Sequence, residues 1–435
     1  MTNGVNVRDV ALECLLSITR DGNFSHLVMQ DVLSKYQYLE KQERSFLNRL
    51  VMGTLERMRE LDYIINQFST VKVNKMKPVI RLILRMGVYQ LLYMDSVPDS
   101  AVCNESVNLA KKRSFQNLKG FVNGVLRNIA REKEHIVYPD KEKDPKAYLE
   151  VAYSVPGWIL DLWMKEYDTD TVEEMLQAFL TEGPTCIRVN TGKISVEELS
   201  IRLKAQGITA EAHPEEERAL YISNYDYLNR IPEFKEGLFY IQDISSMQIG
   251  NVAAPKPGDI CIDVCAAPGG KSLHVAELLQ GTGQVYARDL TPKKVALIED
   301  NILRMGAGNV TAQMWDATIL DETMVEKADV VLADLPCSGL GILGKKPDIK
   351  YRLSMEQVKD IVVLQRQILD VVCQYVKPNG TLVYSTCTIN GMENGDNVKW
   401  FLEKHKEYEL VAEKQIMPKK GYNDGFFYAK FLKRG

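Results

Sequence analysis

Residues 259–278 read DICIDVCAAPGGKSLHVAEL, a hydrophobic run followed by a Gly/Pro turn and then a helical pattern. This order predicts a strand, a tight loop and the start of a helix, in which Gly269 and Gly270 let a ligand approach the backbone closely. The loop lacks the GxGxxG spacing of dinucleotide-binding enzymes, so hydride transfer is not supported. The stretch predicts a binding loop for an adenosine-type cofactor.

Strands and helices alternate regularly from about residue 240 onward. Strand-like runs in CIDVCAA, QVYARDL, VTAQMWDA, ADVVLADLP and GTLVYSTCT are separated by helical patterns. Such alternation predicts a parallel, doubly wound sheet that binds its ligands beyond the carboxyl ends of the strands.

Two aspartates lie at consecutive strand ends. Asp289 follows Gly269 by twenty residues, where an acid can accept hydrogen bonds from both ribose hydroxyls. Asp316, in MWDAT, could accept from an adenine amine. Both could instead cap a helix or a turn, which aspartate often does. Their placement at successive strand ends favours the ligand-binding role.

Two cysteines also follow strand-like runs. Cys337 lies in VVLADLPCSGLG (330–341) and Cys387 in GTLVYSTCTIN (380–390). A thiolate that adds to carbon 6 of cytosine makes carbon 5 nucleophilic, and a second group must then help to release the product. A single free cysteine is usually a small buried hydrophobe. A pair at strand ends beside a cofactor loop predicts attack on a pyrimidine ring, although chemistry alone does not say which sulfur attacks.

The residues around Asp334 distinguish carbon from amine methylation. Enzymes that methylate an exocyclic amine typically carry an acid or amide, two prolines and an aromatic residue, without a nucleophile. Here Pro336 and Cys337 fill the third and fourth positions, which favours carbon methylation. Asp334 lies within reach of the cytosine edge or of a cofactor amine. Lys271 could add positive charge to this site or could lie in solvent.

The first 135 residues carry apolar side chains at helical spacing almost throughout. Pro78 fits the first turn of the helix KPVIRLILRMGVYQLLYM, whose apolar content predicts a central, buried element. Asp99 and Ser100 are candidate caps of the following helix. The segment ERSFLNRLVMGTLERMRELDYIINQF also has helical spacing throughout. Because no β-type alternation interrupts this region, it is predicted to be an all-α domain.

A chain of 435 residues exceeds what a single core usually serves, so several domains are expected. The charged, proline-bearing segment 131–148 is typical of a linker, and the order of elements after it suggests a ferredoxin-like module. The predicted division is an all-α domain at 1–140, a linker and connecting helix at 141–168, a small α+β module at 169–240 and an α/β domain at 241–435.

Charge is unevenly distributed along the chain. Residues 1–140 contain 20 Lys and Arg against 15 Asp and Glu, a balance of +5, whereas the whole chain carries −4 and the remainder therefore −9. A basic surface on an acidic protein is consistent with contact to a phosphate backbone, and an ordinary solvated face explains it nearly as well. Lys111, Lys112 and Arg113 are the candidate contacts to RNA.

Cysteine usage and the N-terminus indicate a cytoplasmic protein. The eight cysteines form no CxxC pair and the five histidines are scattered, so no metal site is expected and a reducing compartment fits best. The start, MTNGVNVRDVALECLL, is too polar for a signal peptide, and no apolar run approaches the roughly 20 residues that cross a bilayer. We expect a monomer without membrane association.

The C-terminal half resembles the NOL/Sun family of RNA 5-methylcytosine methyltransferases. The matching segments are CAAPGGK (265–271), Asp289, Asp316, DLPCSG (334–339), STCT (385–388), GMEN (391–394) and NDGFFYAKF (423–431). The resemblance implies S-adenosyl-L-methionine as the cofactor, bound by Cys265, Ala266, Ala267, Pro268, Gly269, Gly270, Lys271, Asp289, Asp316 and Asp334. It also implies that Cys387 is the nucleophile, that Cys337 assists product release and that Asp334 is catalytic. One departure is MWDA, where the family often has a glycine before the aspartate.

The N-terminal region resembles the NusB-like RNA-binding domain, through LRMGVYQLLYM, VPDSAVCNESVNLAKK and GFVNGVLRNIAR. The full layout, an all-α NusB-like bundle, an α+β ferredoxin-like module and an α/β Rossmann-like methyltransferase domain, is similar to bacterial members of the family that act on 16S ribosomal RNA. Methylation of another RNA, such as tRNA or 23S rRNA, is the alternative. A non-catalytic RNA-binding protein and an amine methyltransferase are the rivals, opposed by the intact cysteines and by ADLPC.

Overall fold

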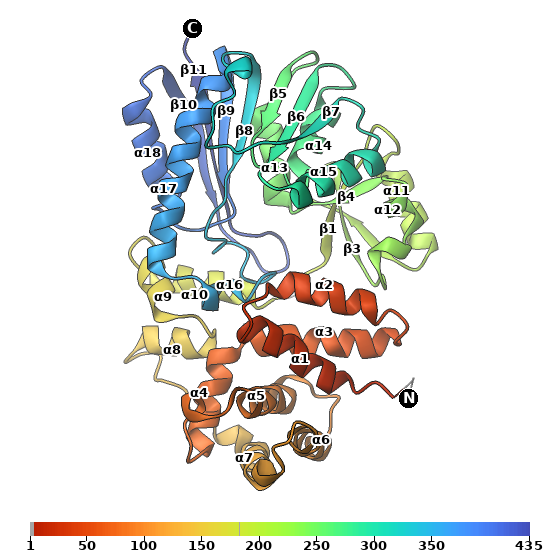
Figure 1. Cartoon of the computed structure of the whole chain (residues 1–435), viewed down its shortest axis with the longest axis vertical. Coiled ribbons are helices and arrows are strands. Elements are labelled where there is room, and N and C mark those ends of the chain that lie inside the picture. The colour runs from red at the N-terminus through yellow and green to blue at the C-terminus, as the bar shows by residue number, and fades with distance from the viewer. Residues whose placement is uncertain (1–3, 182) are drawn as a thin grey trace. The chain divides into compact units, whose positions relative to one another are not determined.

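The computed structural model describes residues 4–181 and 183–435. The chain divides into two compact units, which are described separately (Figure 1). The helical unit comprises Met1–Leu180 and Leu343–Arg352, and the catalytic unit comprises Thr181–Ile342 and Leu353–Gly435. Over the described residues, no helix combines the length and apolar character needed to cross a membrane.

The helical unit begins with seven helices that enclose one apolar core. They are α1 (Val7–Thr19), α2 (Ser25–Lys35), α3 (Lys41–Glu56), α4 (Met58–Phe68), α5 (Pro78–Tyr93), α6 (Asp99–Lys112) and α7 (Lys119–Glu132). Pro78 occupies the first turn of α5, and nearly every residue from Ile80 to Leu91 in that helix is buried, so the predicted central helix is confirmed. The expected all-α character of this region is confirmed as well.

The predicted helical spacing from Glu43 to Phe68 is confirmed by α3 and α4, which are separated at Arg57, where the guanidinium lies over the Tyr93 ring and donates to Glu60. One local prediction for this unit is wrong. Neither Asp99 nor Ser100 caps α6, because Pro98 is the capping residue and no side chain bonds the first turn.

Three further helices and one returning segment complete the helical unit. The helices are α8 (Pro145–Ala152), α9 (Gly157–Trp163) and α10 (Thr169–Phe179), and the segment 343–352 contains α16 (Ile349–Arg352). Asp348 accepts hydrogen bonds from the backbone and hydroxyl of Ser25. Lys350 Nζ donates to the Glu56 carbonyl at 2.7 Å, and Tyr351 Oη lies 2.9 Å from Ser154 Oγ.

A four-stranded antiparallel sheet opens the catalytic unit. Its elements are β1 (Thr185–Val189), α11 (Val196–Ala205), β2 (Thr209–Ala212), β3 (Ala219–Ser223), α12 (Pro232–Lys235) and β4 (Phe239–Ile241). The strand order β2-β3-β1-β4, built from a βαββαβ chain order, confirms the predicted ferredoxin-like module. Arg188 of β1 is buried and pairs with Glu277 of α14 (Gly270–Leu278), which fixes the module to the larger sheet.

The larger sheet has seven strands in the order β10-β11-β9-β8-β5-β6-β7. The strands are β5 (Ile260–Asp263), β6 (Gln284–Asp289), β7 (Val310–Met314), β8 (Ala328–Asp334), β9 (Val376–Thr386), β10 (Tyr408–Ile416) and β11 (Phe426–Lys433). The β7-to-β9 portion is parallel, but β11 pairs antiparallel with both β9 and β10. The expectation of a wholly parallel sheet is therefore wrong at this edge, where a short connection between β10 and β11 makes a hairpin.

Helices cover both faces of this sheet (Figure 1). They are α13 (Ile244–Ala253), α14, α15 (Pro292–Met305), α17 (Met355–Val372) and α18 (Gly395–Lys404). Alternate strand residues serve the two faces: Ile262 and Val331 pack with α17 and α18, whereas Cys261 and Val330 pack with α13, α14 and α15. Single-turn 3-10 helices lie at Val73–Lys75, Gln116–Leu118, Lys133–His135, Leu228–Arg230, Glu322–Met324 and Cys373–Tyr375.

Candidate active site

The two predicted cysteines meet at the carboxyl ends of β8 and β9. These strands are parallel neighbours with Asp334 opposite Ser385, so the residues that follow them leave the sheet side by side. The Sγ atoms of Cys337 and Cys387 lie 3.2 Å apart, and both residues are half-buried and unoxidised. The residues that follow the two cysteines are Ser338 and Thr388, and their hydroxyls form a hydrogen bond of 2.7 Å.

Lys271 and Asp334 form an ion pair in the same site. Lys271 Nζ lies 2.7 Å from Asp334 Oδ2 and 5.4 Å from the centre of the Phe426 ring, and Ser385 Oγ donates to Asp334 Oδ1 at 2.7 Å. Burial alone would lower the pKa of Lys271, but the charge of Asp334 raises it, so the ammonium stays protonated. Lys271 is only 14% exposed, and the possibility that it lies in solvent is wrong.

The segment Cys265–Lys271 comprises a tight loop after β5 and the first two residues of α14. Gly269 adopts φ +107°, a conformation that favours glycine, and Leu273 N donates to its carbonyl as α14 begins. Ala266 N donates to the Arg288 carbonyl, and Ala267 N donates to Asp289 Oδ2 at 3.0 Å. The loop is therefore held against β6, with Pro268 exposed and the N-terminus of α14 behind it.

Asp289 and Asp316 both lie where predicted, at the ends of β6 and β7. Asp289 is buried, accepts from Leu290 N at 2.8 Å and pairs with Lys294 at 2.9 Å. Asp316 Oδ1 accepts from the backbone and hydroxyl of Thr318, which lowers the pKa of Asp316. These bonds show that both residues stabilise turns. Oδ2 of Asp316 makes no hydrogen bond among the described residues, so it keeps an acceptor for a ligand.

Asp263 ends β5 directly before the glycine loop and was not predicted as a site residue from the sequence. Asp263 is almost wholly buried, and Oδ2 accepts from Ser272 Oγ at 2.6 Å while Oδ1 has no partner among the described residues. Burial raises the pKa of Asp263 to about 7. An aspartate at the end of the first strand, before CAAPGG, was the available signal.

Glu393 was also missed as an individual residue, although it lies in the GMEN segment. Its side chain is fully buried, and its carboxylate contacts the backbone of the Cys337 loop. The position of Glu393 after β9 gives no sign of this partner in the sequence, because Ser338 and Glu393 are 55 residues apart and meet only in the folded chain.

Comparison with known proteins identifies all three regions. Residues 251–432 match the family 16S rRNA methyltransferase RsmB/F, residues 5–131 match the NusB family, and residues 155–226 match the ferredoxin-like domain of RsmF/B-like methyltransferases. The Probable ribosomal RNA small subunit methyltransferase B of Bacillus subtilis (strain 168) is 35% identical over 99% of each chain. This chain belongs to the ribosomal RNA small-subunit methyltransferase B family.

Solved structures agree with this membership. The crystal structure of PH0851 covers 100% of both chains with 26% identity and a TM-score of 0.83. The structure of NSun6 from Pyrococcus horikoshii with SFG covers 64% of this chain and 97% of its own, with 24% identity and a TM-score of 0.55, and shares the fold. As a member of the methyltransferase B family, the protein is an rRNA methyltransferase with the fold of S-adenosylmethionine-dependent enzymes, and the predicted three-part architecture is confirmed.

Proposed function

We propose that the enzyme methylates carbon 5 of a cytosine in 16S ribosomal RNA through a covalent adduct between Cys387 and carbon 6, with S-adenosyl-L-methionine as methyl donor. The observation that carries the proposal is the 3.2 Å contact between Cys337 and Cys387 beside the Lys271–Asp334 pair. The names of the curated relatives support the small-subunit RNA as substrate. The enzyme would act in the cytoplasm as a monomer.

The residues around the glycine loop fit an adenosine-type cofactor. Gly269 has no side chain and lets a ligand approach the backbone closely. Carboxylates lie at the ends of three strands, from Asp289, Asp316 and Asp334. Two carboxylate oxygens, Oδ1 of Asp263 and Oδ2 of Asp316, lack a hydrogen-bond donor among the described residues, which suits a ligand rich in hydroxyls and amines. When bound there, S-adenosyl-L-methionine would supply an electrophilic methyl group. The solved structure of NSun6 with SFG, which shares this fold, supports a fold able to hold such a cofactor.

Cys387 is the proposed nucleophile. A cytosine turned out of the RNA stack would expose carbon 6 to its sulfur. The thiolate forms the sulfur–carbon 6 bond, and the ring electrons make carbon 5 nucleophilic. Lys271 places a fixed positive charge near this sulfur and holds Asp334 in place for the edge of the base.

Cys337 is the proposed assistant in product release. After methylation, the carbon 5 proton passes to water, its electron pair restores the carbon 5–carbon 6 double bond, and the sulfur of Cys387 departs as a thiolate. At 3.2 Å, the Cys337 thiol donates a hydrogen bond to that thiolate and stabilises the leaving group. The pair then returns to its starting state with its proton on Cys337.

Two measurements test the proposal. Methylation of carbon 5 must displace the hydrogen there, whereas methylation of the amine leaves it in place, so cytosine labelled with tritium at carbon 5 should release its label in step with methyl transfer. Cys387→Ala should abolish transfer and form no adduct, whereas Cys337→Ala should transfer the methyl group and accumulate a protein–RNA species that survives denaturing electrophoresis. An adduct trapped in Cys387→Ala would exchange the two roles, and activity without an adduct in either variant would overturn the covalent mechanism.

A further inference from the structure

Glu393 is a buried carboxylate that the proposed chemistry does not use. It lies between β9 and α18, is fully buried and does not contact either sulfur through a hydrogen bond. Burial raises the pKa of Glu393. Hydrogen bonds donated by Ser338, Asn390 and Gln365 act in the opposite direction and lower the pKa, and donors to both oxygens match an ionised carboxylate. Burying a charge costs free energy that its hydrogen bonds offset only in part, so we asked what the position of Glu393 does for the site.

Glu393 holds the backbone immediately after Cys337. Ser338 N donates to Oε1 at 2.8 Å, Gln365 Nε2 donates to the same oxygen at 3.1 Å, and Asn390 Nδ2 donates to Oε2 at 2.7 Å. Gln365, on α17, is also fully buried.

Gln365 holds the backbone immediately before Cys337. Its Nε2 donates to the Pro336 carbonyl at 2.8 Å, and its Oε1 accepts from Asn397 Nδ2 at 2.8 Å, which fixes the amide orientation. The peptide groups on both sides of Cys337 are thus anchored to one buried Glu393–Gln365 pair. The thiol has little freedom to move away from Cys387.

The charges around the two sulfurs differ in sign. The hydrogen bond with Cys387, burial, and the charges of Cys387 and Glu393 raise the pKa of the Cys337 thiol well above its usual value. Tyr384 is a further titratable group that interacts electrostatically with Cys337. Cys387 instead interacts with the ammonium of Lys271, which also faces Asp334. The surroundings of Cys337 therefore favour its protonated thiol.

We propose that Glu393 is a positioning residue for Cys337, which clamps the Cys337 loop together with Gln365 and whose negative charge keeps the Cys337 thiol protonated. This inference rests on the proposed covalent mechanism. It gives a physical reason for two adjacent cysteines to perform different tasks, since Cys337 is held in place as the thiol that product release requires.

The test compares two variants that separate charge from clamping. Glu393→Gln should lower multiple-turnover kcat by about tenfold or more with little change in KM for RNA, and should accumulate the adduct. It should also shift the pH midpoint of Cys337 alkylation by iodoacetamide downward by about one unit, as expected for loss of a nearby charge. Gln365→Leu keeps the charge, so it should accumulate the adduct without moving that midpoint.

Glu403→Gln is the matched control, because Glu403 lies on the exposed side of α18 and should leave every readout unchanged. Wild-type turnover and alkylation in a folded Glu393→Gln variant would overturn the inference. If Glu393→Gln does not fold, absence of adduct in Gln365→Leu would overturn it instead. Failure of Cys337→Ala to trap an adduct would count against the covalent mechanism itself, which keeps the two failures distinct.

Discussion

Asp263 and Asp289 end neighbouring strands on either side of the glycine loop, yet their surroundings differ. Asp289 accepts from two backbone N–H groups and pairs with Lys294, so its charge is well compensated. Asp263 has one hydroxyl donor for one oxygen and none for the other among the described residues. Asp289 is therefore tested through cofactor binding, and Asp263 through the pH dependence of stability.

We expect Asp289→Asn to weaken S-adenosyl-L-methionine binding by roughly 1.5–3 kcal/mol, the usual scale for losing a hydrogen bond to a charged group. Asparagine is preferable to alanine here because Asp289 is buried and holds Ala267 of the loop. Calorimetry should show the loss, and Lys294→Met, which removes only the ion-pair partner, should bind nearly normally. Wild-type affinity in Asp289→Asn would mean that the ribose is held elsewhere.

Asp263 should make stability fall as the pH rises. Its pKa is raised to about 7 in the folded protein against an ordinary value of 3.8, so between these values the folded state binds more protons than the unfolded state. Asp263→Asn removes this titration. Between pH 3.8 and about 7, the free energy of unfolding of Asp263→Asn should therefore rise relative to that of the wild type by about 1.4 kcal/mol per pH unit. Urea unfolding at pH 5, 6 and 7 measures the difference, and a constant difference would contradict the assignment.

At the residue scale, the sequence predicted which residues form the site better than it predicted the contacts that those residues make. Cys337, Cys387 and Asp334 could be placed because parallel strands end at one edge of a sheet. The Lys271–Asp334 pair and the Glu393–Gln365 clamp could not, because they join residues from different strands and helices whose side-chain directions depend on the whole fold. Asp289 illustrates both cases, since its strand-end position was predicted and its hold on Ala267 was not.

At the scale of elements, long periodic patterns were reliable and their interruptions were not. The helix from Pro78 and the ferredoxin-like strand order follow from local spacing. The break at Arg57 depends on Tyr93, which lies one helix away, and the antiparallel edge depends on the turn between β10 and β11. The segment 343–352 is a further case, because a loop of the catalytic sheet is folded as part of the helical unit.

Lys350 is the feature of that segment with a measurable energetic effect. Burial lowers the pKa of Lys350 to about 7, whereas in the unfolded chain the side chain keeps its proton up to its ordinary pKa of about 10.5. Between these values the unfolded state binds more protons, so stability rises with pH. Lys350→Met should lack this rise in stability with pH. From about pH 7 to 9, the free energy of unfolding of the wild type should therefore increase relative to that of Lys350→Met by about 1.4 kcal/mol per pH unit. Parallel pH profiles in urea unfolding would show that Lys350 is solvated.

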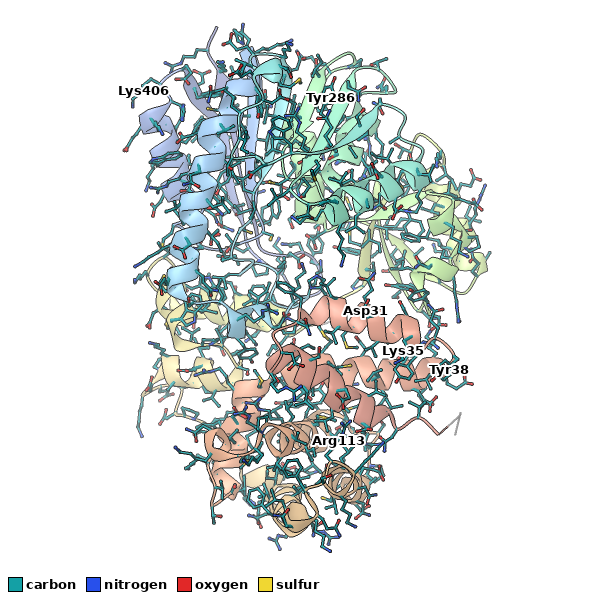
Figure 2. The ribbon with its side chains drawn as sticks, viewed as in Figure 1. Asp31, Lys35, Tyr38, Arg113, Tyr286 and Lys406 are labelled. Atoms are coloured by element: carbon teal, nitrogen blue, oxygen red, sulfur yellow. The ribbon has the colours of Figure 1, made fainter. Side chains whose placement is uncertain are left out.

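At the scale of the whole molecule, charge separates into a basic N-terminal region and an acidic remainder. The structure changes which basic residues are suited to bind RNA. Lys112 pairs with Asp9, and Arg113 (labelled in Figure 2) pairs with Asp9 and Glu13, so neutralising them would also remove ion pairs of the fold. Lys72, Lys75 and Lys77, between α4 and α5, are exposed, and none pairs with a carboxylate among the described residues.

Replacing Lys72, Lys75 and Lys77 by glutamine should weaken binding to rRNA fragments. If all three contact phosphates of single-stranded RNA, the slope of log affinity against log salt should become shallower by about 2, because each contact releases roughly 0.7 of a counterion. Cofactor affinity should not change. Arg113→Gln is the informative comparison: it should lower thermal stability through the lost pairs with Asp9 and Glu13 and alter the salt slope little. If the triple variant keeps the wild-type salt slope, residues 72–77 do not contact the RNA. If Arg113→Gln changes the slope more than the triple variant does, the RNA contact lies at the C-terminal end of α6 instead.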